Sequence, residues 1–188
     1  MNNNDGKFSD GILAKNGLIS FIPTSSNKVL KFDPANHDNP LTEIGYDLEL
    51  TGRKYGGRVF GKDGNIYCTP FIAHQVLRID VDSDKTSFMG DEHEGEGKWG
   101  DRVVAKDGNI DVSPLLANQI LQIHTKNQTT SLVGPILGGS LKWISFVEGK
   151  DGLLNVIPTN ANNLLRFDPI VHTTILIPLN QNLVGDQK

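Results

Sequence analysis

The feature that constrains this chain most is an internal repeat. Four copies of one unit follow one another, and each opens with a lysine and an aromatic residue: Lys7-Phe8, Lys54-Tyr55, Lys98-Trp99 and Lys142-Trp143. Each aromatic residue is followed, at fixed distances, by a glycine and then by a proline: Gly17, Gly64, Gly108 and Gly152, and Pro23, Pro70, Pro114 and Pro158. Self-similarity in a constant register indicates a repeat architecture with units of about 44 residues.

Each unit reads as four short strands separated by turn residues. In the second unit we expect strands at 58–60, 66–68, 76–79 and 86–89. The Asp-Gly pair before the second strand supplies the positive φ that a tight hairpin requires. Pro70 ends that strand, because proline has no N–H to donate to a sheet ladder. Four antiparallel strands per unit are therefore predicted.

Composition places the chain among ordinary globular proteins of the all-β class. It has 188 residues, of which 37% are apolar and 21% charged, and its 20 glycines and 9 prolines punctuate the short strands. A net charge of −4 disfavours a general nucleic-acid binder, which needs a basic surface. The apolar stretches are far shorter than the roughly 20 residues that cross a bilayer. We therefore expect a soluble protein without nucleic-acid or membrane partners.

The cellular setting is predicted from two further features. Residues 1–6 carry neither a charged leader nor an apolar stretch, and so they do not resemble a secretory signal. Cys68 is the single cysteine, which rules out an internal disulfide. Both features favour a reducing, cytoplasmic environment.

Residues 64–80 carry a resemblance to a known fold family. Their Asp-Gly hairpin, the run Ile-Tyr-Cys-Thr-Pro and the strand Val-Leu-Arg-Ile-Asp are similar to repeats of the virginiamycin B lyase-like and NHL-like β-propellers. The resemblance implies that each unit is one propeller blade. We expect an N-terminal tail and four blades in a single repeat domain, with these bounds: tail 1–6 and blades 7–53, 54–97, 98–141 and 142–188.

The number of units leaves the closure of the propeller open. Four blades are at the small end of the usual range for propellers, and in one alternative the chain forms a closed four-bladed ring. In a second alternative it is a half ring completed by self-association as a homodimer. In a third it is a segment of a longer array, because a fifth lysine-aromatic pair would begin at Lys188. In each alternative Trp99 and Trp143 should be buried between adjacent blades.

Repetition also suggests a ligand site at one mouth of the axial channel. Four lysines at equivalent positions would form a ring of ammonium groups that attracts an anion: Lys7, Lys54, Lys98 and Lys142. Arg58 and Arg102 occupy equivalent positions on the strands expected to line the channel. A simpler role for the lysines is a solvent-exposed ammonium beside an aromatic ring that packs between blades.

Metal sites are expected to be absent, although one stretch partly resembles a calcium loop. Asp80, Asp82, Asp84 and Asp91 have the spacing of a calcium loop, but Lys85 stands where such a loop needs glycine. The same residues suit a hairpin between two strands. The acidic stretch 91–96 could hold a hard cation, but it is better explained as a solvated loop. We predict no metal and no cofactor.

Two classes of function remain. The favoured prediction is a non-catalytic binding scaffold whose loops, all on one face, contact a protein or a small ligand. The alternative is an enzyme of the lyase or lactonase type with its site at the channel mouth, as the resemblance implies. No catalytic residues are assigned, because no nucleophile-base set is visible in the sequence.

Overall fold

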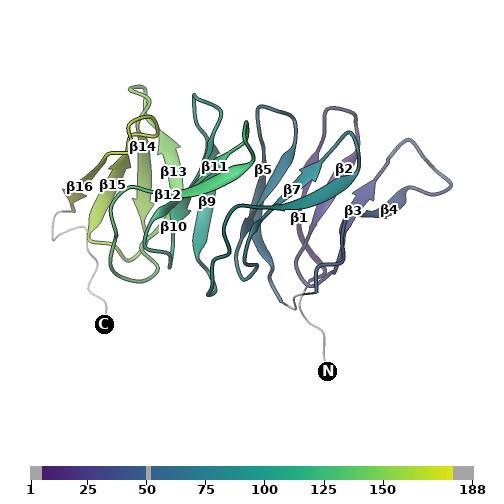
Figure 1. Cartoon of the computed structure of the whole chain (residues 1–188), viewed down its shortest axis with the longest axis horizontal. Helices are drawn as coiled ribbons and strands as arrows, with labels where there is room; N and C mark the ends of the chain where they lie inside the picture. The colour runs from purple at the N-terminus through teal and green to yellow at the C-terminus, as the bar shows by residue number, and fades with distance from the viewer. Residues whose placement is uncertain (1–5, 50–51, 180–188) are drawn as a thin grey trace.

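The structure is a computed structural model that describes residues 6–49 and 52–179. In this part of the chain all regular structure is β-strand, arranged as four antiparallel sheets of four strands (Figure 1). The all-β prediction is confirmed. Among these residues no helix is long and apolar enough to cross a membrane. Residues 1–5 of the expected tail and Lys188, where a fifth unit would begin, lie outside the described residues.

Strand order in each sheet follows chain order. The first sheet contains β1 (Phe8–Leu13), β2 (Ile19–Pro23), β3 (Val29–Phe32) and β4 (Leu41–Ile44). The second contains β5 (Tyr55–Phe60), β6 (Ile66–Pro70), β7 (Val76–Asp80) and β8 (Lys85–Met89). The third contains β9 (Trp99–Val104), β10 (Ile110–Pro114), β11 (Ile120–His124) and β12 (Thr129–Val133). The fourth contains β13 (Trp143–Glu148), β14 (Leu154–Pro158), β15 (Asn163–Phe167) and β16 (Thr174–Pro178).

The turn between the first two strands of each sheet is built as the sequence indicates. Its glycine lies in the left-handed region, with φ between 82° and 93° in all four sheets: Gly17, Gly64, Gly108 and Gly152. Only glycine adopts this conformation without steric cost, so the Asp-Gly and Asn-Gly pairs set the hairpin. Each proline ends the second strand, as predicted.

Aromatic residues at the start of the first strand hold neighbouring sheets together. In every sheet the pairing register shifts directly after this residue, for example between Tyr55 and Gly57. Tyr55, Trp99 and Trp143 are only 1–3% exposed. Each belongs to a core formed by two consecutive sheets, so the predicted burial of both tryptophans between blades is confirmed.

The hydrophobic core is accordingly divided into three, one part for each pair of consecutive sheets. Ile22 and Val29 of the first sheet pack with Tyr55 and Leu77 of the second. Cys68 lies in this same core, where burial raises the pKa of its thiol to about 12. The second and third sheets therefore use one face for the preceding sheet and the other face for the following sheet.

The four sheets stand side by side as an open row (Figure 1). The first sheet, with β3 and β4, lies at one end, and the fourth sheet, with β15 and β16, lies at the opposite end. The arrangement is that of four blades of a propeller. Closure into a four-bladed ring, the first alternative from the sequence, is not confirmed.

The inter-sheet cores predict the effect of removing one aromatic side chain. Trp99→Ala should lower the free energy of unfolding by about 3–5 kcal/mol, because it leaves a large cavity between the second and third sheets. Phe8→Ala is the matched control, since Phe8 holds the same position in the first sheet but is only half-buried there. Urea unfolding followed by circular dichroism measures both. An equal loss in the two variants would contradict the assignment.

Candidate functional site

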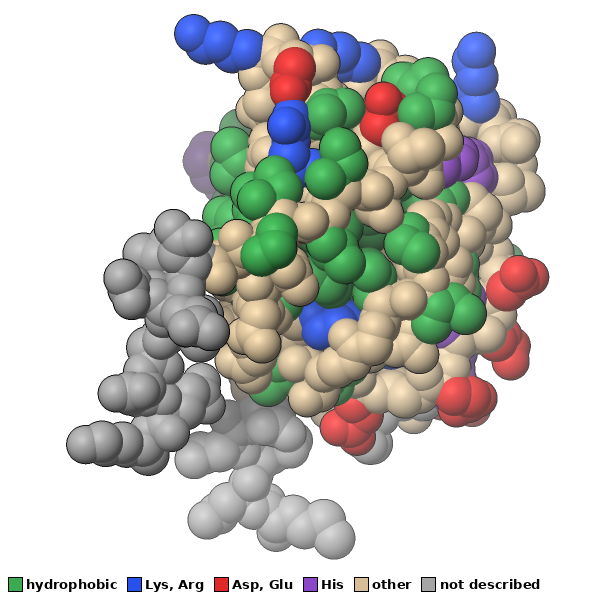
Figure 2. Space-filling model, turned by 90° about the vertical axis from the view of Figure 1, so that its left-hand side faces the viewer, with side chains coloured by type: hydrophobic (Ala, Val, Ile, Leu, Met, Phe, Trp, Pro, Cys, Tyr) green, Lys and Arg blue, Asp and Glu red, His purple; other side chains and the backbone are tan. Residues whose placement is uncertain are grey.

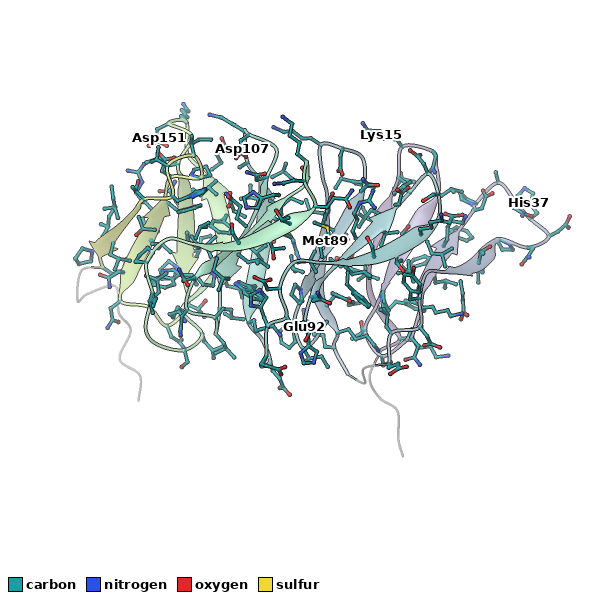
Figure 3. All side chains as sticks on the ribbon, in the orientation of Figure 1. Lys15, His37, Met89, Glu92, Asp107 and Asp151 are labelled. Carbon is teal, nitrogen blue, oxygen red and sulfur yellow. The ribbon has the colours of Figure 1, made fainter. Side chains whose placement is uncertain are left out.

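The row of blades has two edges with different chemistry. The turns that contain Lys15, Asp107 and Asp151 lie along one edge, and Glu92 lies at the other (Figure 3). We call this second edge the loop face. It is formed by the connections from second to third strand and by those from one sheet to the next: residues 24–28, 71–75, 115–119 and 159–162, and residues 45–49, 52–54, 90–98 and 134–142.

Three of the four predicted lysines are buried below the loop face. Lys54, Lys98 and Lys142 are 0%, 5% and 2% exposed. The Lys98 Nζ donates to the carbonyl oxygens of Phe71 and Ala73, at 3.2 and 3.0 Å, and to that of Gly95 at 2.7 Å. Phe71 and Ala73 belong to the preceding sheet's turn. Burial lowers the pKa of the Lys98 ammonium, and the charges of Glu94 and Glu96 oppose this shift.

The same contact recurs at the neighbouring sheets. The Lys54 Nζ donates to the carbonyls of Thr24 and Ser26, at 3.2 and 3.1 Å. The Lys142 Nζ donates to those of Leu116 and Gly139, at 3.4 and 2.9 Å. These ammonium groups therefore bind the turn of the preceding blade. The prediction that they extend into solvent is wrong for Lys54, Lys98 and Lys142. Lys7 is exposed, because the described residues contain no blade before the first one.

The burial of three lysines leaves the predicted anion site with fewer free ammonium groups. The sequence placed four free ammonium groups around a channel mouth, whereas three of them are occupied by main-chain carbonyls. An anion would have to displace these carbonyls. Anion binding by the lysines stays a prediction, and the structure gives Lys54, Lys98 and Lys142 a structural contact instead.

Arg58 and Arg102 lie on the first strands of the second and third sheets, and each reaches back to the preceding sheet. Arg58 forms an ion pair with Asp10 and donates to the carbonyl of Gly11 at 2.8 Å. Arg102 approaches the Thr69 hydroxyl at 3.5 Å. Both arginines thus lie on first strands and contact the preceding sheet, and ligand binding by them stays a prediction.

Polar side chains continue toward the fourth sheet along the first strands of the sheets, β1, β5, β9 and β13, which we call the inner strands. The Asp101 carboxylate pairs with Arg102 at 3.3 Å and accepts a hydrogen bond from the Ser145 hydroxyl at 2.7 Å. Phe146 takes the arginine's position in the fourth sheet. We call Asp10, Arg58, Asp101, Arg102 and Ser145 the inner polar row. It offers paired charges and one hydroxyl whose partner is a carboxylate.

The loop face contains a groove between each pair of consecutive blades. The groove between the second and third blades has a volume of about 510 Å³ and is lined by Trp99, Leu116 and Ile136 together with Glu92, Glu94 and Glu96. The groove between the first two blades has a volume of about 380 Å³ and shares Glu92 and Glu94. The third groove, of about 530 Å³, shares Ile136. The grooves are therefore continuous neighbours on one face.

Large apolar side chains are exposed along these grooves. Ile136 is 80% exposed, and Leu116, Leu132 and Phe88 are 39–48% exposed. The His93 ring stands edge-on to Trp99 with 4.9 Å between the ring centroids, and burial lowers the pKa of His93. Sequence reasoning noticed the acidic stretch 91–96 but missed its apolar neighbours. Leu116, Leu132 and Ile136 are at least 20 residues along the chain from this stretch, so only the fold brings them together.

Three of the four aspartates that have the spacing of a calcium loop lie in and beside the turn between β7 and β8. The Asp80 carboxylate accepts hydrogen bonds from the N–H groups of Asp82 and Ser83 and pairs with Arg78 at 3.0 Å. The hydrogen bond to Ser83 is the main reason that the pKa of Asp80 is lowered. Across residues 6–49 and 52–179, no group of three or more acidic, histidine or cysteine side chains is arranged to hold a metal ion.

Asp111 is a buried carboxyl group that sequence reasoning did not single out. It is 0% exposed, and its Oδ1 accepts a hydrogen bond from the Gln122 amide at 2.9 Å on the neighbouring strand. Within the described residues, Asp111 Oδ2 and Gln122 Oε1 have no hydrogen-bond partner. Burial raises the pKa of Asp111 to about 7. A neutral carboxyl, which can donate, therefore suits this position better than a carboxylate.

The lysine contact predicts a stability loss that depends on the preceding blade. Lys98→Met should reduce the free energy of unfolding by roughly 1–3 kcal/mol, since buried carbonyls of the second blade lose their donor. Lys7→Met should have little effect in the monomer, because Lys7 is exposed. Chemical denaturation compares the two variants. An unchanged free energy of unfolding in Lys98→Met would show that the buried contact contributes nothing to stability.

Asp111 predicts a decrease in stability as the pH rises from about 4 to about 7. Its carboxyl has an ordinary pKa of 3.8 when unfolded, so in this range the unfolded chain is ionised while the folded chain keeps the proton. The slope should be at most about 1.4 kcal/mol per pH unit. Asp111→Asn should remove this slope, whereas Asp82→Asn, in an exposed turn of the second sheet, should retain it. Thermal melts at several pH values test the difference.

Comparison with known proteins identifies the fold of the chain but assigns it to no family. No protein-family model and no curated protein sequence matches the chain. Solved structures do match. Virginiamycin B lyase from Staphylococcus aureus superposes with a TM-score of 0.69 at 16% identity, covering 95% of this chain and 58% of the lyase. A catalytically inactive variant of that lyase, with quinupristin, gives a TM-score of 0.70 at 16% identity over 96% of this chain and 58% of the lyase.

A second kind of protein shows the same fold. A putative 6-phosphogluconolactonase from Bacteroides uniformis has a TM-score of 0.58 at 18% identity, over 91% of this chain and 53% of that protein. The chain therefore spans little more than half the length of each of these three structures. At these identities the likeness concerns the fold alone. The resemblance noted from residues 64–80 is confirmed, and the chain has the fold of β-propeller blades.

Proposed function

We propose that the chain is a binding scaffold whose loop face recognises a partner segment with basic and aliphatic side chains. The carrying observation is the groove between the second and third blades, where exposed Leu116 and Ile136 lie beside three glutamates. Apolar patches with a polar rim are typical of interaction sites. Carboxylates at the rim select a basic partner by charge.

The position of this surface on a rigid support favours binding. The loops are fixed to the blades by main-chain hydrogen bonds, such as the one from the His93 N–H to the His74 carbonyl at 2.9 Å. An equivalent bond joins the Leu137 N–H to the Asn118 carbonyl at 2.8 Å. A partner would thus meet a largely preformed groove, which reduces the entropy lost on binding.

A peptide selection tests the proposal. Phage-displayed peptides selected on the chain should be enriched in Lys or Arg alternating with Leu, Ile or Val. Ile136→Ser and Glu92→Gln should each weaken binding of a selected peptide by about tenfold or more, as for central interface positions. Titration calorimetry measures this effect. Added salt should also lower the affinity of the unchanged chain for the peptide.

Matched controls come from the opposite edge. Leu13→Ser and Asp82→Asn remove an exposed aliphatic side chain and an exposed carboxylate away from the loop face. They should leave peptide affinity unchanged. Selection of acidic peptides, or an equal loss in the controls, would overturn the proposal.

An enzyme of the lyase or lactonase type remains the second candidate, and the inner polar row favours it. The hydrogen bond from Ser145 to Asp101 places a hydroxyl beside a carboxylate and the Arg102 guanidinium. The solved structures with this fold include a lyase and a putative lactonase. Turnover of quinupristin or of a sugar-acid lactone that Ser145→Ala abolishes would favour this candidate over the scaffold.

A further inference from the structure

The two end sheets of the row each present an apolar face that no other part of residues 6–49 and 52–179 covers. On the first sheet the face contains Phe8, Ile19, Phe21, Leu30 and Phe32, which we call the leading face. Its three rings adjoin one another, with centroids 6.2 and 6.5 Å apart. All five side chains are half-buried. The equivalent residues of the other sheets are at most 3% exposed, because the preceding blade covers them.

The fourth sheet presents the face that would pack against a following blade. We call Val147, Ile157, Leu164, Ile175 and Ile177 the trailing face. Val147, Ile157, Ile175 and Ile177 are 40–56% exposed. Figure 2 looks onto this end of the row, and apolar side chains gather over the middle of the sheet. The leading and trailing faces are therefore the two halves of one inter-blade contact.

At two positions the trailing face is more apolar than the covered faces of the second and third sheets; at the first of these positions the first sheet also has an isoleucine, Ile22. Ile157 stands where the second and third sheets have Thr69 and Ser113. Ile175 stands where those sheets have Ser87 and Ser131. Terminal units that face water in repeat proteins carry a polar outer surface. The fourth sheet has the reverse composition, which indicates that another blade covers it.

The lysine contact indicates that this covering blade has the same repeat. Lys54 and Lys98 bind carbonyls of the preceding turn, at Thr24 and Ser26 and at Phe71 and Ala73. The equivalent carbonyls of the fourth sheet belong to Thr159 and Ala161. Lys7 is the one equivalent lysine that is exposed in the described chain. A contact between the trailing face and a leading face would bring Lys7 to these two carbonyls.

We propose that two copies of this chain associate head to tail, the leading face of each against the trailing face of the other, to close one ring of eight blades. Propellers have about four to eight blades. One copy supplies four and stands open, two copies supply eight, and three would exceed the range. The new contact differs from the internal ones at the fourth strands. Inside the row Thr86 of the second sheet contacts Gly45, which follows the first sheet. In the new contact the equivalent residues would be Leu41 and Pro178.

Sedimentation velocity over a hundredfold range of concentration tests the association. We expect a species of twice the chain mass that dissociates on dilution. Phe21→Glu on the leading face and Ile157→Glu on the trailing face should each raise the dissociation constant at least about tenfold. Leu13→Glu, an exposed site at the turn edge, is the control. Lys7→Met should weaken the dimer, whereas Lys15→Met should not.

Mixing the two face variants separates this geometry from a symmetric contact. Each variant alone spoils both contacts of the ring, whereas a mixture retains one contact between two unchanged faces. The mixture should therefore form more dimer than either variant alone. A dimer that tolerates one of the face variants, an open polymer, or a monomer throughout would overturn the proposal. A monomer would indicate that blades of a longer chain, or of another protein, cover these faces.

Discussion

A buried ammonium group that joins two consecutive turns is the contact on which the arrangement of blades depends. The Lys98 carbonyl accepts from the N–H groups of Leu115 and Ala117 in its own blade, while its Nζ donates to Phe71 and Ala73 in the preceding blade. A buried charge is tolerated only when hydrogen bonds replace its hydration. Three carbonyls do so here. The contact is directional, because the lysine always belongs to the following blade and the carbonyls to the preceding one.

Strands and turns were predictable from the sequence because their causes are local. The glycine at each hairpin, such as Gly64, fixes φ within one turn, and Pro70 ends a strand by its own chemistry. The burial of Lys98 was not predictable in this way, since its partners in the preceding blade, Phe71 and Ala73, lie more than 20 residues earlier and accept through main-chain atoms with no sequence signature. The only available signal was that a lysine recurs beside the aromatic residue in all four units. Closure depends on small rotations between blades, which no local pattern encodes.

The candidate site shows the converse, because it is formed where the units differ. Asp47, Glu92 and Ile136 hold equivalent places in three successive loops, just before the residues whose N–H groups bind the preceding turn. Their backbone is fixed by the repeat while their side chains are free to vary. The result is a surface that changes along the row from acidic to aliphatic. A repeat search identifies the constant positions and therefore overlooks the variable ones.

Assembly also decides what the inner polar row can do chemically. In an open row these side chains lie on the inner strands with water on one side, and the charge of Asp101, whose side chain is about 43% exposed, is well screened. In a closed ring the same carboxylate, Arg102 and Ser145 would line a narrow channel, where water is restricted and electrostatic interactions are stronger. The apolar end faces and the inner polar row are therefore linked. If the ring closes as proposed, covering the former changes the dielectric environment of the latter, and any activity of the inner strands would then belong to the closed assembly.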